Sequence, residues 1–474
     1  MKVKQKGILY GNIDGNIDEI MDEDDKGNFN GNMYGVKYRS ANEMKESGIE
    51  WLGLIPKIWS TKKTKYITSC YPSTVDKKSY PSENSIKLCN YTDVYYNYYI
   101  TKDLVFIEAT ATKSQIRKFG IKKNDILITK DSETPDDIGI ASFVKEDVPN
   151  LLCGYHLSMI RSIAKQEPLF LYFQLRSIGI RNYFETRANG VTRYGIGNDG
   201  FRNLLLATSS TAEERKIANF LDIKTAQFES IIAKKEQLIK KLEDAKKALI
   251  SEVVTGKVKI IDGKLVARQP DELKGSGIEW IGMIPRDWEI KKIKNIAYMK
   301  SGDFITADDI ENEGTYPVFG GNGLRGYTKL FNTNGYKVLI GRQGALCGNV
   351  NYADGKYWAS EHAIVVNKVN GTSIKWFGEL LRIMNLNQYS VTAAQPGISV
   401  GMINNLYVPC PTSNDQYQIS EYLSNYLSSF SQIINYILEQ IQLLKSAKQS
   451  LISEAVTGKI DLQDWKIIEQ EGAS

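Results

Sequence analysis

The feature that most constrains the fold of this 474-residue chain is an internal duplication. The segment SGIEWLGLIPKIW at 47–59 returns as SGIEWIGMIPRDW at 276–288, with nine identities in thirteen positions and an offset of 276 − 47 = 229. A second pair, LISEVVTGK at 249–257 and LISEAVTGK at 451–459, has eight identities in nine at an offset of 202. Repeats of this quality indicate one structural unit used twice. Because the offsets differ by 229 − 202 = 27, the first copy carries 27 more residues between its two repeated motifs.

The closing segment of each copy has the heptad pattern of one long helix. Segments 217–257 and 419–459 align without a gap, and apolar residues recur at the a and d positions of both. A Thr-Gly pair ends each pattern, while Ser210-Thr211 and Ser413-Asn414 are candidate N-caps. We expect the two helices to pack against each other, the alternative being that each packs only on its own globular domain. The expected seam consists of Ile217, Leu221, Phe228, Ile231, Leu238, Leu242, Leu249, Ile419, Leu423, Phe430, Ile433, Ile437, Leu444 and Leu451.

The blocks between the repeats read as globular α+β domains. Short β-rich runs are broken by Gly, Asn and Asp, and 125–129 and 336–340 are candidate strands. Each block ends in a related turn, RYGIG at 193–197 and QPGIS at 395–399, again at an offset of 202. His156 and His362 precede these turns by similar distances, which indicates an equivalent position in the fold rather than a catalytic pair, since no nucleophile and acid recur beside both.

These patterns divide the chain into alternating domains and helices. The fold class is α+β, a tandem duplication of two globular domains separated by two long helices that form an antiparallel coiled coil. The expected segments are a disordered extension at 1–36, a first domain at 37–208, a central helix at 209–258, a linker at 259–274, a second domain at 275–411, a C-terminal helix at 412–460 and a tail at 461–474.

Composition sets outer bounds on function. Hydrophobic residues make up 42% and charged residues 24%, the balance of a globular protein, and no apolar run of about 18 residues could span a membrane. The first residues lack the apolar stretch of a signal peptide, and five scattered cysteines form no C-x-x-C pair, so we expect a cytoplasmic protein. The net charge of +5 permits nucleic-acid binding without establishing it.

Catalytic motifs are missing from the sequence. No Pro-Pro pair is present for the loop with which amino-methyltransferases hold their target amine, and no Gly-Lys pair is followed by Ser or Thr as in a P-loop. The G-x-G-x-x-G match at 321–326 is followed by no convincing helix, and two histidines argue against a His-rich metal site. We therefore expect no catalytic residue, no cofactor and no metal in this chain.

Polar and basic residues in both blocks suit DNA recognition. The first block carries a basic run with hydroxyl and amide groups, and the second places Arg, Gln and Asn on Gly-rich loops, where such side chains can contact phosphates and base edges. A solvated charged face is the competing interpretation. The candidate DNA-binding residues are Thr112, Lys113, Ser114, Arg117, Lys118, Lys130, Arg193, Tyr194, Asn322, Arg325, Arg342, Gln343, Gln395 and Ser399. Tyr91, Tyr95, Tyr96, Tyr98 and Tyr99 are further residues that can pack on sugar or base.

From about residue 37 to 460 the chain resembles the specificity subunit of type I restriction-modification systems. The resemblance rests on the Gly-Ile-Glu-Trp opening of each half, the Pro-Gly-Ile-Ser turn at 396–399, the helix entry at 415–419 and the Leu-Ile-Ser-Glu ending of each helix. The loops at 319–323 and 341–345 are also similar to those of this family. The first half departs from the pattern with Ala207 and Ser209 in place of Pro409 and Pro411, and with Glu213-Glu214 in place of Asp415-Gln416.

The resemblance implies a non-catalytic DNA-recognition subunit. Two target-recognition domains would each read one half of a bipartite, asymmetric site on double-stranded DNA, and the paired helices would set the spacing. Two methyltransferase subunits would dock on this frame, and two restriction subunits would add the motor and nuclease. S-adenosylmethionine, ATP and Mg would be bound by those partners. The alternatives are a stand-alone methyltransferase or nuclease with fused specificity domains, and a coiled-coil scaffold that does not bind DNA.

Overall fold

The computed structural model describes residues 36–163, 166–344, 346–368, 371–390 and 396–466, so the expected extension at 1–36 lies outside the described residues except for Val36. The chain divides into two compact units. The first unit has the described residues up to 234 and from 439, and the second unit has those from 235 to 438. Two 44-residue helices, α7 (Thr211–Val254) and α10 (Ser413–Val456), each contribute one part to each unit. None of the helices in these ranges combines the length and hydropathy of a membrane span.

The first unit is built on a five-stranded sheet. Its strand order is β5 (Thr68–Pro72), β13 (Leu157–Ser162), β9 (Ile126–Thr129), β11 (Ala141–Val144) and β7 (Tyr99–Ile100). Two three-stranded sheets flank it: β12 (Leu151–Cys153), β6 (Asn84–Cys89) and β8 (Ile107–Ala111); and β10 (Asp131–Ser132), β15 (Tyr194–Ile196) and β14 (Ala188–Asn189). This unit also contains two strand pairs, β2 (Met44–Glu46) with β3 (Leu54–Pro56) and β4 (Ser60–Lys63) with β16 (Leu205–Thr208). Its short helices are α2 (Tyr91–Tyr96), α3 (Lys113–Phe119), α4 (Pro168–Leu175), α5 (Ile178–Arg187) and α6 (Asn198–Arg202).

The second unit repeats this plan with fewer insertions. One four-stranded sheet has the order β22 (Ala297–Ser301), β29 (Ala363–Lys368), β26 (Lys337–Gly341) and β27 (Val350–Ala353). Another has the order β24 (Gly323–Thr328), β23 (Tyr316–Gly320), β28 (Lys356–Ala359) and β25 (Thr333–Asn334). Pairs β19 (Leu273–Gly275) with β20 (Met283–Pro285) and β21 (Glu289–Lys292) with β30 (Tyr407–Cys410) lie beside them, with helices α8 (Ile374–Ile383) and α9 (Val400–Asn404). The architecture is therefore α+β and duplicated, as expected.

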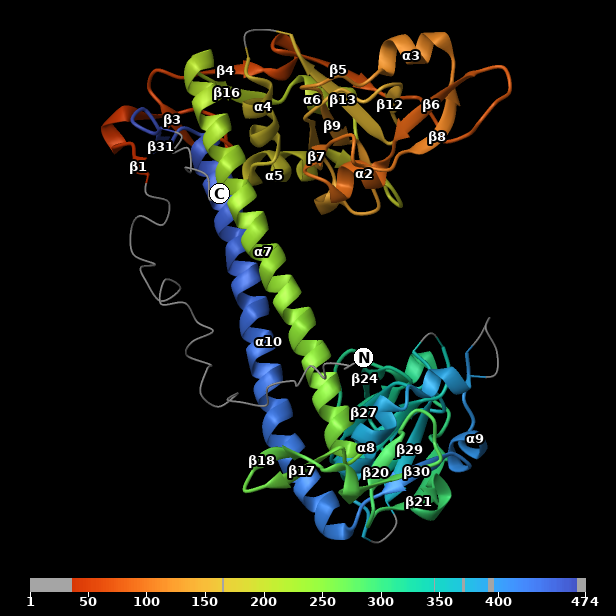
Figure 1. The fold of residues 1–474 in the computed structure, drawn as a ribbon. Helices are drawn as coiled ribbons and strands as arrows, with labels where there is room; N and C mark the ends of the chain where they lie inside the picture. The colour runs from red at the N-terminus through yellow and green to blue at the C-terminus, as the bar shows by residue number, and fades with distance from the viewer. Residues whose placement is uncertain (1–35, 164–165, 345, 369–370, 391–395, 467–474) are drawn as a thin grey trace, which may run out of the picture. The chain divides into compact units, whose positions relative to one another are not determined.

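The two long helices pair antiparallel within each unit (Figure 1). In the first unit, Leu221 near the start of α7 shares a core with Leu451 near the end of α10. In the second unit, Val253 near the end of α7 shares a core with Leu423 near the start of α10. The same two cores also contain residues of the globular domains, so each helix packs both on the other helix and on a domain.

The residues that are buried between the helices differ in part from the expected heptad pattern. Ile231 is 43% exposed, and its neighbour Ile232 is buried in its place, so the assignment of Ile231 to the seam was wrong. In α10, Leu427 and Ile441, which the expected seam did not include, are also buried. Ile231 and Ile232 are both apolar, so the sequence pattern alone did not decide which of them faces the core. The expected seam residues Leu238, Leu242, Ile433 and Leu444 are half-buried, and all the others except Ile231 are buried.

The helix N-termini are capped at equivalent positions. The Ser210 hydroxyl accepts a hydrogen bond from the backbone N–H of Glu213 at 3.2 Å, as its sequence suggested. In the second copy the cap is Thr412, whose hydroxyl accepts from the N–H of Asp415 at 3.2 Å, and Ser413 is already helical. The expected cap at 413–414 was therefore displaced by one residue. Ser210 and Thr412 correspond at the offset of 202, so the duplication predicts this position better than residue type does.

Both long helices end in a glycine that supports a tryptophan. Gly256 and Gly458 have φ of +72° and +71°, and the N–H of the residue after each glycine bonds to the carbonyl five residues back, as in a Schellman motif. A Cβ on Gly256 would lie 2.8 Å from a ring atom of Trp288, and one on Gly458 would lie 3.0 Å from the same atom of Trp59. The repeated tryptophan motif therefore closes over the repeated helix end, and only glycine fits there.

The two tryptophan motifs close over the ends of different helices. The motif of the second copy meets the end of the preceding helix, α7, whereas the motif of the first copy meets the end of the last helix, α10. Strand β1 (Lys37–Tyr38) pairs with β31 (Ile460–Asp461) at the same place. The segment expected to be a linker holds the hairpin of β17 (Val258–Ile261) and β18 (Lys264–Ala267).

At the start of the long helices, two differences between the copies compensate for each other. Ser209 donates its N–H to the buried carboxylate of Glu214 at 3.0 Å. At the equivalent place Pro411 has no N–H, and its carbonyl instead accepts from the side-chain amide of Gln416 at 3.1 Å. A carboxylate accepts only, whereas an amide also donates, so each helix residue matches the backbone group that faces it.

Candidate nucleic-acid interface

One end of the central sheet in the first unit carries several candidate residues. Strand β9 leaves the sheet at Lys130 and continues as β10, where Asp131 pairs with Gly195 of β15. The backbone of Lys130 also accepts from the N–H of Ile196 at 2.9 Å and donates to His156 at 3.1 Å. The register of these strands places the side chains of 131, 156 and 193 at one edge.

These three side chains form a charged cluster. Arg193 donates from Nε and Nη2 to Oδ1 of Asp131 at 3.1 and 2.7 Å. His156 Nδ1 lies 2.9 Å from Oδ1 of the same carboxylate and 3.2 Å from Nη2 of Arg193. The side chain of Asp131 is 16% exposed and that of Arg193 54%. The carboxylate therefore lies beneath an arginine whose outer face is open to a ligand.

A hollow of about 620 Å³ adjoins this cluster. One wall comes from α2 and its flanks, where Tyr91 and Tyr95 stack with ring centroids 5.6 Å apart and the Tyr95 hydroxyl donates to Asp137 at 2.9 Å. The opposite wall contains Tyr155 and His156, whose rings meet edge to face at 5.0 Å. Helix α2 lies in the stretch 90–106 between β6 and β8, whereas the equivalent β23 and β24 are joined by residues 321–322 alone. The tyrosine wall is therefore an insertion of the first domain.

The second unit has the same framework with different side chains. The N–H of Arg342 donates to the carbonyl of His362 at 2.8 Å, and its carbonyl accepts from Ile398 at 2.9 Å, matching the bonds around Lys130. Gln343 bridges to Gly397 as Asp131 does to Gly195. His362 Nδ1 lies 3.0 Å from Oε1 of Gln343. The two histidines therefore do occupy equivalent positions, and the amide of Gln343 replaces the carboxylate of Asp131.

The remaining candidates of the second unit lie beside this framework. Gly321, in the turn before Asn322, lies close to the backbone of Gln343 and His362, since a Cβ there would be 3.2 Å from both carbonyl oxygens. Asn322 accepts from Asn349 at 3.2 Å, and Arg325 is exposed on β24. Ser399 caps α9 by accepting from the N–H of Met402 at 3.1 Å. Gln395 lies outside the described residues.

A second group of candidates in the first unit lies on α3. Lys113, Ser114, Arg117 and Lys118 are exposed on this helix. Thr112 is its N-cap, with the hydroxyl accepting from the N–H of Gln115 at 3.2 Å and donating to the Gln115 amide oxygen at 2.9 Å. The hydroxyl of Thr112, like that of Ser399, therefore has a structural role, whereas the basic side chains face solvent.

The side chain of Lys130, another candidate of the first unit, is bonded to the backbone. Its ammonium donates to the Ser73 carbonyl at 2.9 Å, and burial lowers the pKa of Lys130.

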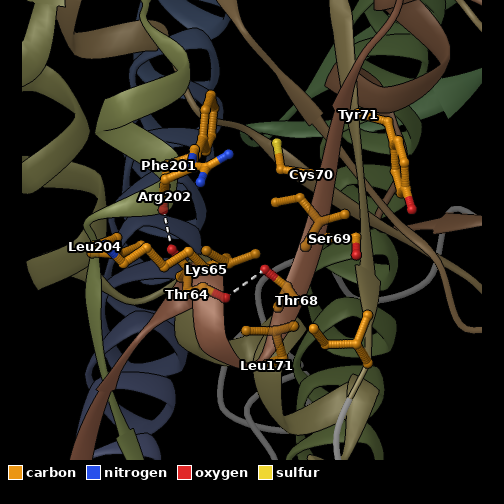
Figure 2. A pocket seen from close by; sticks show the side chains of 13 residues that line it. Thr64, Lys65, Thr68, Ser69, Cys70, Tyr71, Leu171, Phe201, Arg202 and Leu204 are labelled. Carbon is orange, nitrogen blue, oxygen red and sulfur yellow. Dashed lines mark hydrogen bonds between the residues drawn. The ribbon is translucent and has the colours of Figure 1, made fainter.

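A second pocket of the first unit, of about 300 Å³, is shown in Figure 2. It lies where Phe201 of α6 meets the chain around Thr64 and Thr68, whose hydroxyls donate to backbone carbonyls. Burial raises the pKa of Cys70 in its wall to about 11, so this thiol stays protonated at neutral pH. In the described ranges no group of three or more His, Cys, Asp or Glu is arranged to hold a metal ion.

The sequence analysis predicted Arg193, Tyr194 and Gln343 as DNA-binding residues, which stays a prediction, and it did not include Asp131, which is the centre of the cluster. It interpreted His156 as a fold position without a partner. The sequence did contain a signal for this position. Asp131 and Gln343 are each the second residue after an apolar strand, and each precedes the related turn of its own domain. The tyrosines at 91, 95 and 96 were noted, and the structure places them in the wall of the hollow.

Comparisons with known proteins agree with this architecture. The family model described as type I restriction modification DNA specificity domain matches residues 285–443. The EcoprrI specificity subunit of Escherichia coli is 42% identical over 153 residues, which are 31% of this chain and 37% of that protein. The MjaVIII specificity subunit of Methanocaldococcus jannaschii is 21% identical over 372 residues, which are 73% of this chain and 81% of that protein.

The fold likeness extends over most of the chain. A chain in a structure that describes complex assembly and conformational transition of the type I R-M system aligns with 85% of this chain and 99% of its own length, with a TM-score of 0.64 and 16% identity. The matched family model and the EcoprrI relative give no support to the alternatives considered from the sequence, a fused catalytic protein or a DNA-independent scaffold. The match to the type I restriction modification DNA specificity domain therefore covers residues 285–443, and the chain spans 37% of the length of the EcoprrI subunit.

Proposed function

We propose that this chain is the DNA sequence-specificity subunit of a type I restriction-modification complex, in which each domain reads one half of a bipartite, asymmetric site. The observation that carries this proposal is a repeated framework with unlike side chains. Asp131 and His156 in the first domain correspond to Gln343 and His362 in the second, through the same backbone bonds. Equivalent frames present equivalent edges to DNA, while different side chains select different bases.

The long helices are suited to set the spacing between the two half-sites. Each has 44 residues, which corresponds to about 65 Å at 1.5 Å per residue. Half-sites read from one face of DNA are separated by multiples of about 34 Å, one helical turn. A continuous helix pair resists bending better than a loop, and it contributes to the core of each unit. We therefore assign a fixed spacer length to the site.

The pseudo-symmetric frame accounts for two copies of one partner. The tryptophan that closes over each helix end donates to the first turn of the other long helix: Trp59 to Glu213 at 3.0 Å and Trp288 to Asp415 at 2.7 Å. These tryptophans are buried, so the repeated contact belongs to the frame, and a frame built twice in the same way can offer equivalent outer faces to two identical subunits. We assign one methyltransferase subunit to each half, with two restriction subunits completing the complex.

The chemistry of the assembled complex belongs to those partners. In this assignment the methyltransferase subunits bind S-adenosylmethionine and methylate adenine at N6, and the restriction subunits use ATP and Mg for translocation and cleavage. The chain itself contributes DNA affinity and the choice of sequence. Its own polar clusters are consistent with that role, because Arg, Lys, Gln and Asn side chains contact bases and phosphates without reacting.

The decisive experiment maps methylation. The chain is co-expressed with the modification subunit encoded with it in a host lacking adenine methylation, and N6-methyladenine is located genome-wide by single-molecule sequencing. We expect one bipartite motif with a constant spacer. A matched chimaera in which residues 60–195 come from a relative should change one half of that motif and leave the other half and the spacer intact.

Two results would contradict the proposal. A stable complex that leaves the genome unmethylated and binds no DNA sequence preferentially would favour a scaffold. Methylation by the purified chain alone would instead favour a fused enzyme. A motif whose two halves both change in the chimaera would reject the assignment of one half-site to each domain.

A further inference from the structure

The guanidinium of Arg193 is held along one edge and open along another. Its Nε and Nη2 both donate to Oδ1 of Asp131, at 3.1 and 2.7 Å. Nη2 also lies 3.2 Å from Nδ1 of His156, but with the Nδ1 proton directed at the carboxylate this nitrogen accepts nothing from the arginine. A guanidinium presents five N–H groups in a rigid fork, so two donors held on the inner side leave the outer edge formed by Nη1 and Nη2. Among the described residues none accepts a hydrogen bond from Nη1. The edge that faces outward therefore offers two parallel donors in a fixed direction.

His156 and the backbone hold the carboxylate that positions this arginine. Nδ1 of His156 lies 2.9 and 3.0 Å from the two oxygens of Asp131, so a proton on Nδ1 bonds that carboxylate. Asp131 is itself fixed by its strand pairing with Gly195. Gly190 and Arg193 turn tightly, since a Cβ on Gly190 would lie 1.9 Å from the Arg193 carbonyl. The side chain and its backbone are thus both constrained before any ligand binds.

The charges around the hollow favour a base edge over a phosphate. Asp76, Glu133 and Asp137 line it together with Lys77 and Lys78, and Asp131 lies beneath Arg193. A phosphate oxygen placed there would be repelled by the carboxylates, whereas the edge of a base carries no net charge. The tyrosine rings of α2 and Tyr155 add flat apolar walls. A site for the sugar-phosphate backbone would have cations without these acids, as on α3.

We propose that Arg193 recognises a guanine in the half-site of the first domain, with Asp131 and His156 as positioning residues. Guanine is the base that presents two acceptors, O6 and N7, in the major groove, and they match the two parallel donors of a guanidinium edge. This inference rests on the DNA-reading function proposed above and names the base that one of its side chains selects.

The equivalent place in the second domain supplies a matched control. Gln343 lies 3.0 Å from His362 as Asp131 does from His156, but its amide offers one donor and one acceptor. Adenine matches such an amide, because its N6 amino group donates to the amide oxygen and its N7 accepts from the amide nitrogen. Changes at Gln343 should therefore affect the other half of the site and leave the guanine position intact.

The test uses the full chain in complex with its modification subunit. The methylation motif is mapped for the wild type, and the purified complexes are then titrated with duplexes that carry each base at each position. Wild type should require guanine at one position of the first half-site. Arg193→Ala should reduce discrimination at that position alone by about 10- to 100-fold, and Arg193→Gln should shift preference there toward adenine.

Asp131→Asn tests the positioning role with a side chain of the same size. It should relax the same single position and leave discrimination at every other position unchanged, whereas a merely structural role would weaken binding to every sequence alike. Gln343→Ala is the control and should alter only the other half-site. Melting temperatures of all variants show that the folded complex is being compared.

The outcomes separate this inference from the function on which it rests. If the wild-type complex has no sequence preference, the proposed function fails. If the wild-type motif is found but Arg193→Ala and Arg193→Gln leave every position of the first half-site unchanged, the function stands and the assignment of Arg193 is overturned. A first half-site without guanine would overturn it as well.

Discussion

Trp59 packs over Gly458, a residue close to the other end of the chain, in the way that Trp288 packs over Gly256. Each glycine ends a long helix, and each tryptophan belongs to the repeated motif that opens a domain. The repeated structural unit is therefore a helix end followed by a tryptophan motif, and in the first copy that unit is assembled from opposite ends of the sequence. The pairing of β1 with β31 likewise joins segments that are far apart in the sequence.

The glycine at this closure should not tolerate alanine. Gly458→Ala puts a Cβ 2.6 Å from Pro56 and 3.0 Å from Trp59, in addition to the cost of a positive φ, which is about 1–2 kcal/mol. Gly48→Ala is the matched control, because Gly48 has the same φ of +71° and nothing within 4 Å of its Cβ. Urea unfolding should show a larger loss of stability for Gly458→Ala. Equal losses would mean that backbone conformation alone selects glycine there.

The helix seam can be tested with two neighbouring residues. Ile232 is 4% exposed and Ile231 43% exposed, although the heptad assigned the seam to Ile231. Ile232→Asp places an unpaired charge in the core and should lower the free energy of unfolding by about 3 kcal/mol or more. Ile231→Asp should cost less than about 1 kcal/mol. Denaturant titration of both variants decides the register, and the reverse order of stability would restore the heptad assignment.

The buried carboxylate of Glu214 makes stability depend on pH. Burial raises its pKa above the ordinary value of 4.5, although three donors, including Ser209 N–H, oppose that shift. Because the pKa of Glu214 is raised in the folded state, the stability that this residue contributes is fully present below the unfolded pKa. That stability is lost as pH rises through the folded pKa. Glu214→Gln cannot titrate, so wild type should lose stability relative to this variant as pH rises from the ordinary pKa of 4.5 through the raised pKa of the folded state.

The second copy provides the reciprocal variant for this pH test. Gln416→Glu places a carboxylate against the Pro411 carbonyl, which now accepts from the Gln416 amide at 3.1 Å. That carboxylate can bond the carbonyl only when protonated, so the variant should lose stability with rising pH more steeply than wild type. Urea midpoints across this pH range measure both effects. A difference between Glu214→Gln and wild type that stays constant with pH would contradict the role of burial.

The basic side chains of α3 should contribute phosphate contacts rather than sequence selection. Lys113, Arg117 and Lys118 are exposed on this helix. Replacing all three with alanine should weaken binding to every DNA sequence alike and reduce the salt slope of log K by about 0.9 for each phosphate that is no longer neutralised.

A control for the α3 variant removes the same charge elsewhere. Alanine at the exposed Lys234, Lys240 and Lys241 of α7 should change the salt slope less than alanine on α3 does. Anisotropy titrations across salt concentrations measure both slopes. A methylation motif that changes in the α3 variant would instead assign this helix to base recognition.

The sequence by itself determined the duplication, the two long helices, their ends and the α+β class of the domains. These features depend on local chemistry: apolar periodicity, a glycine with positive φ, and hydroxyls at helix starts are all readable within a few residues. Strands β9 and β26 likewise formed where apolar runs placed them. Tertiary structure decided that Trp59 meets Gly458, that Ile232 rather than Ile231 is buried, and that Thr112 and Ser399 use their hydroxyls as caps. It also brought Asp131, His156 and Arg193 together, because strand register and pairing between distant segments set which side chains share an edge.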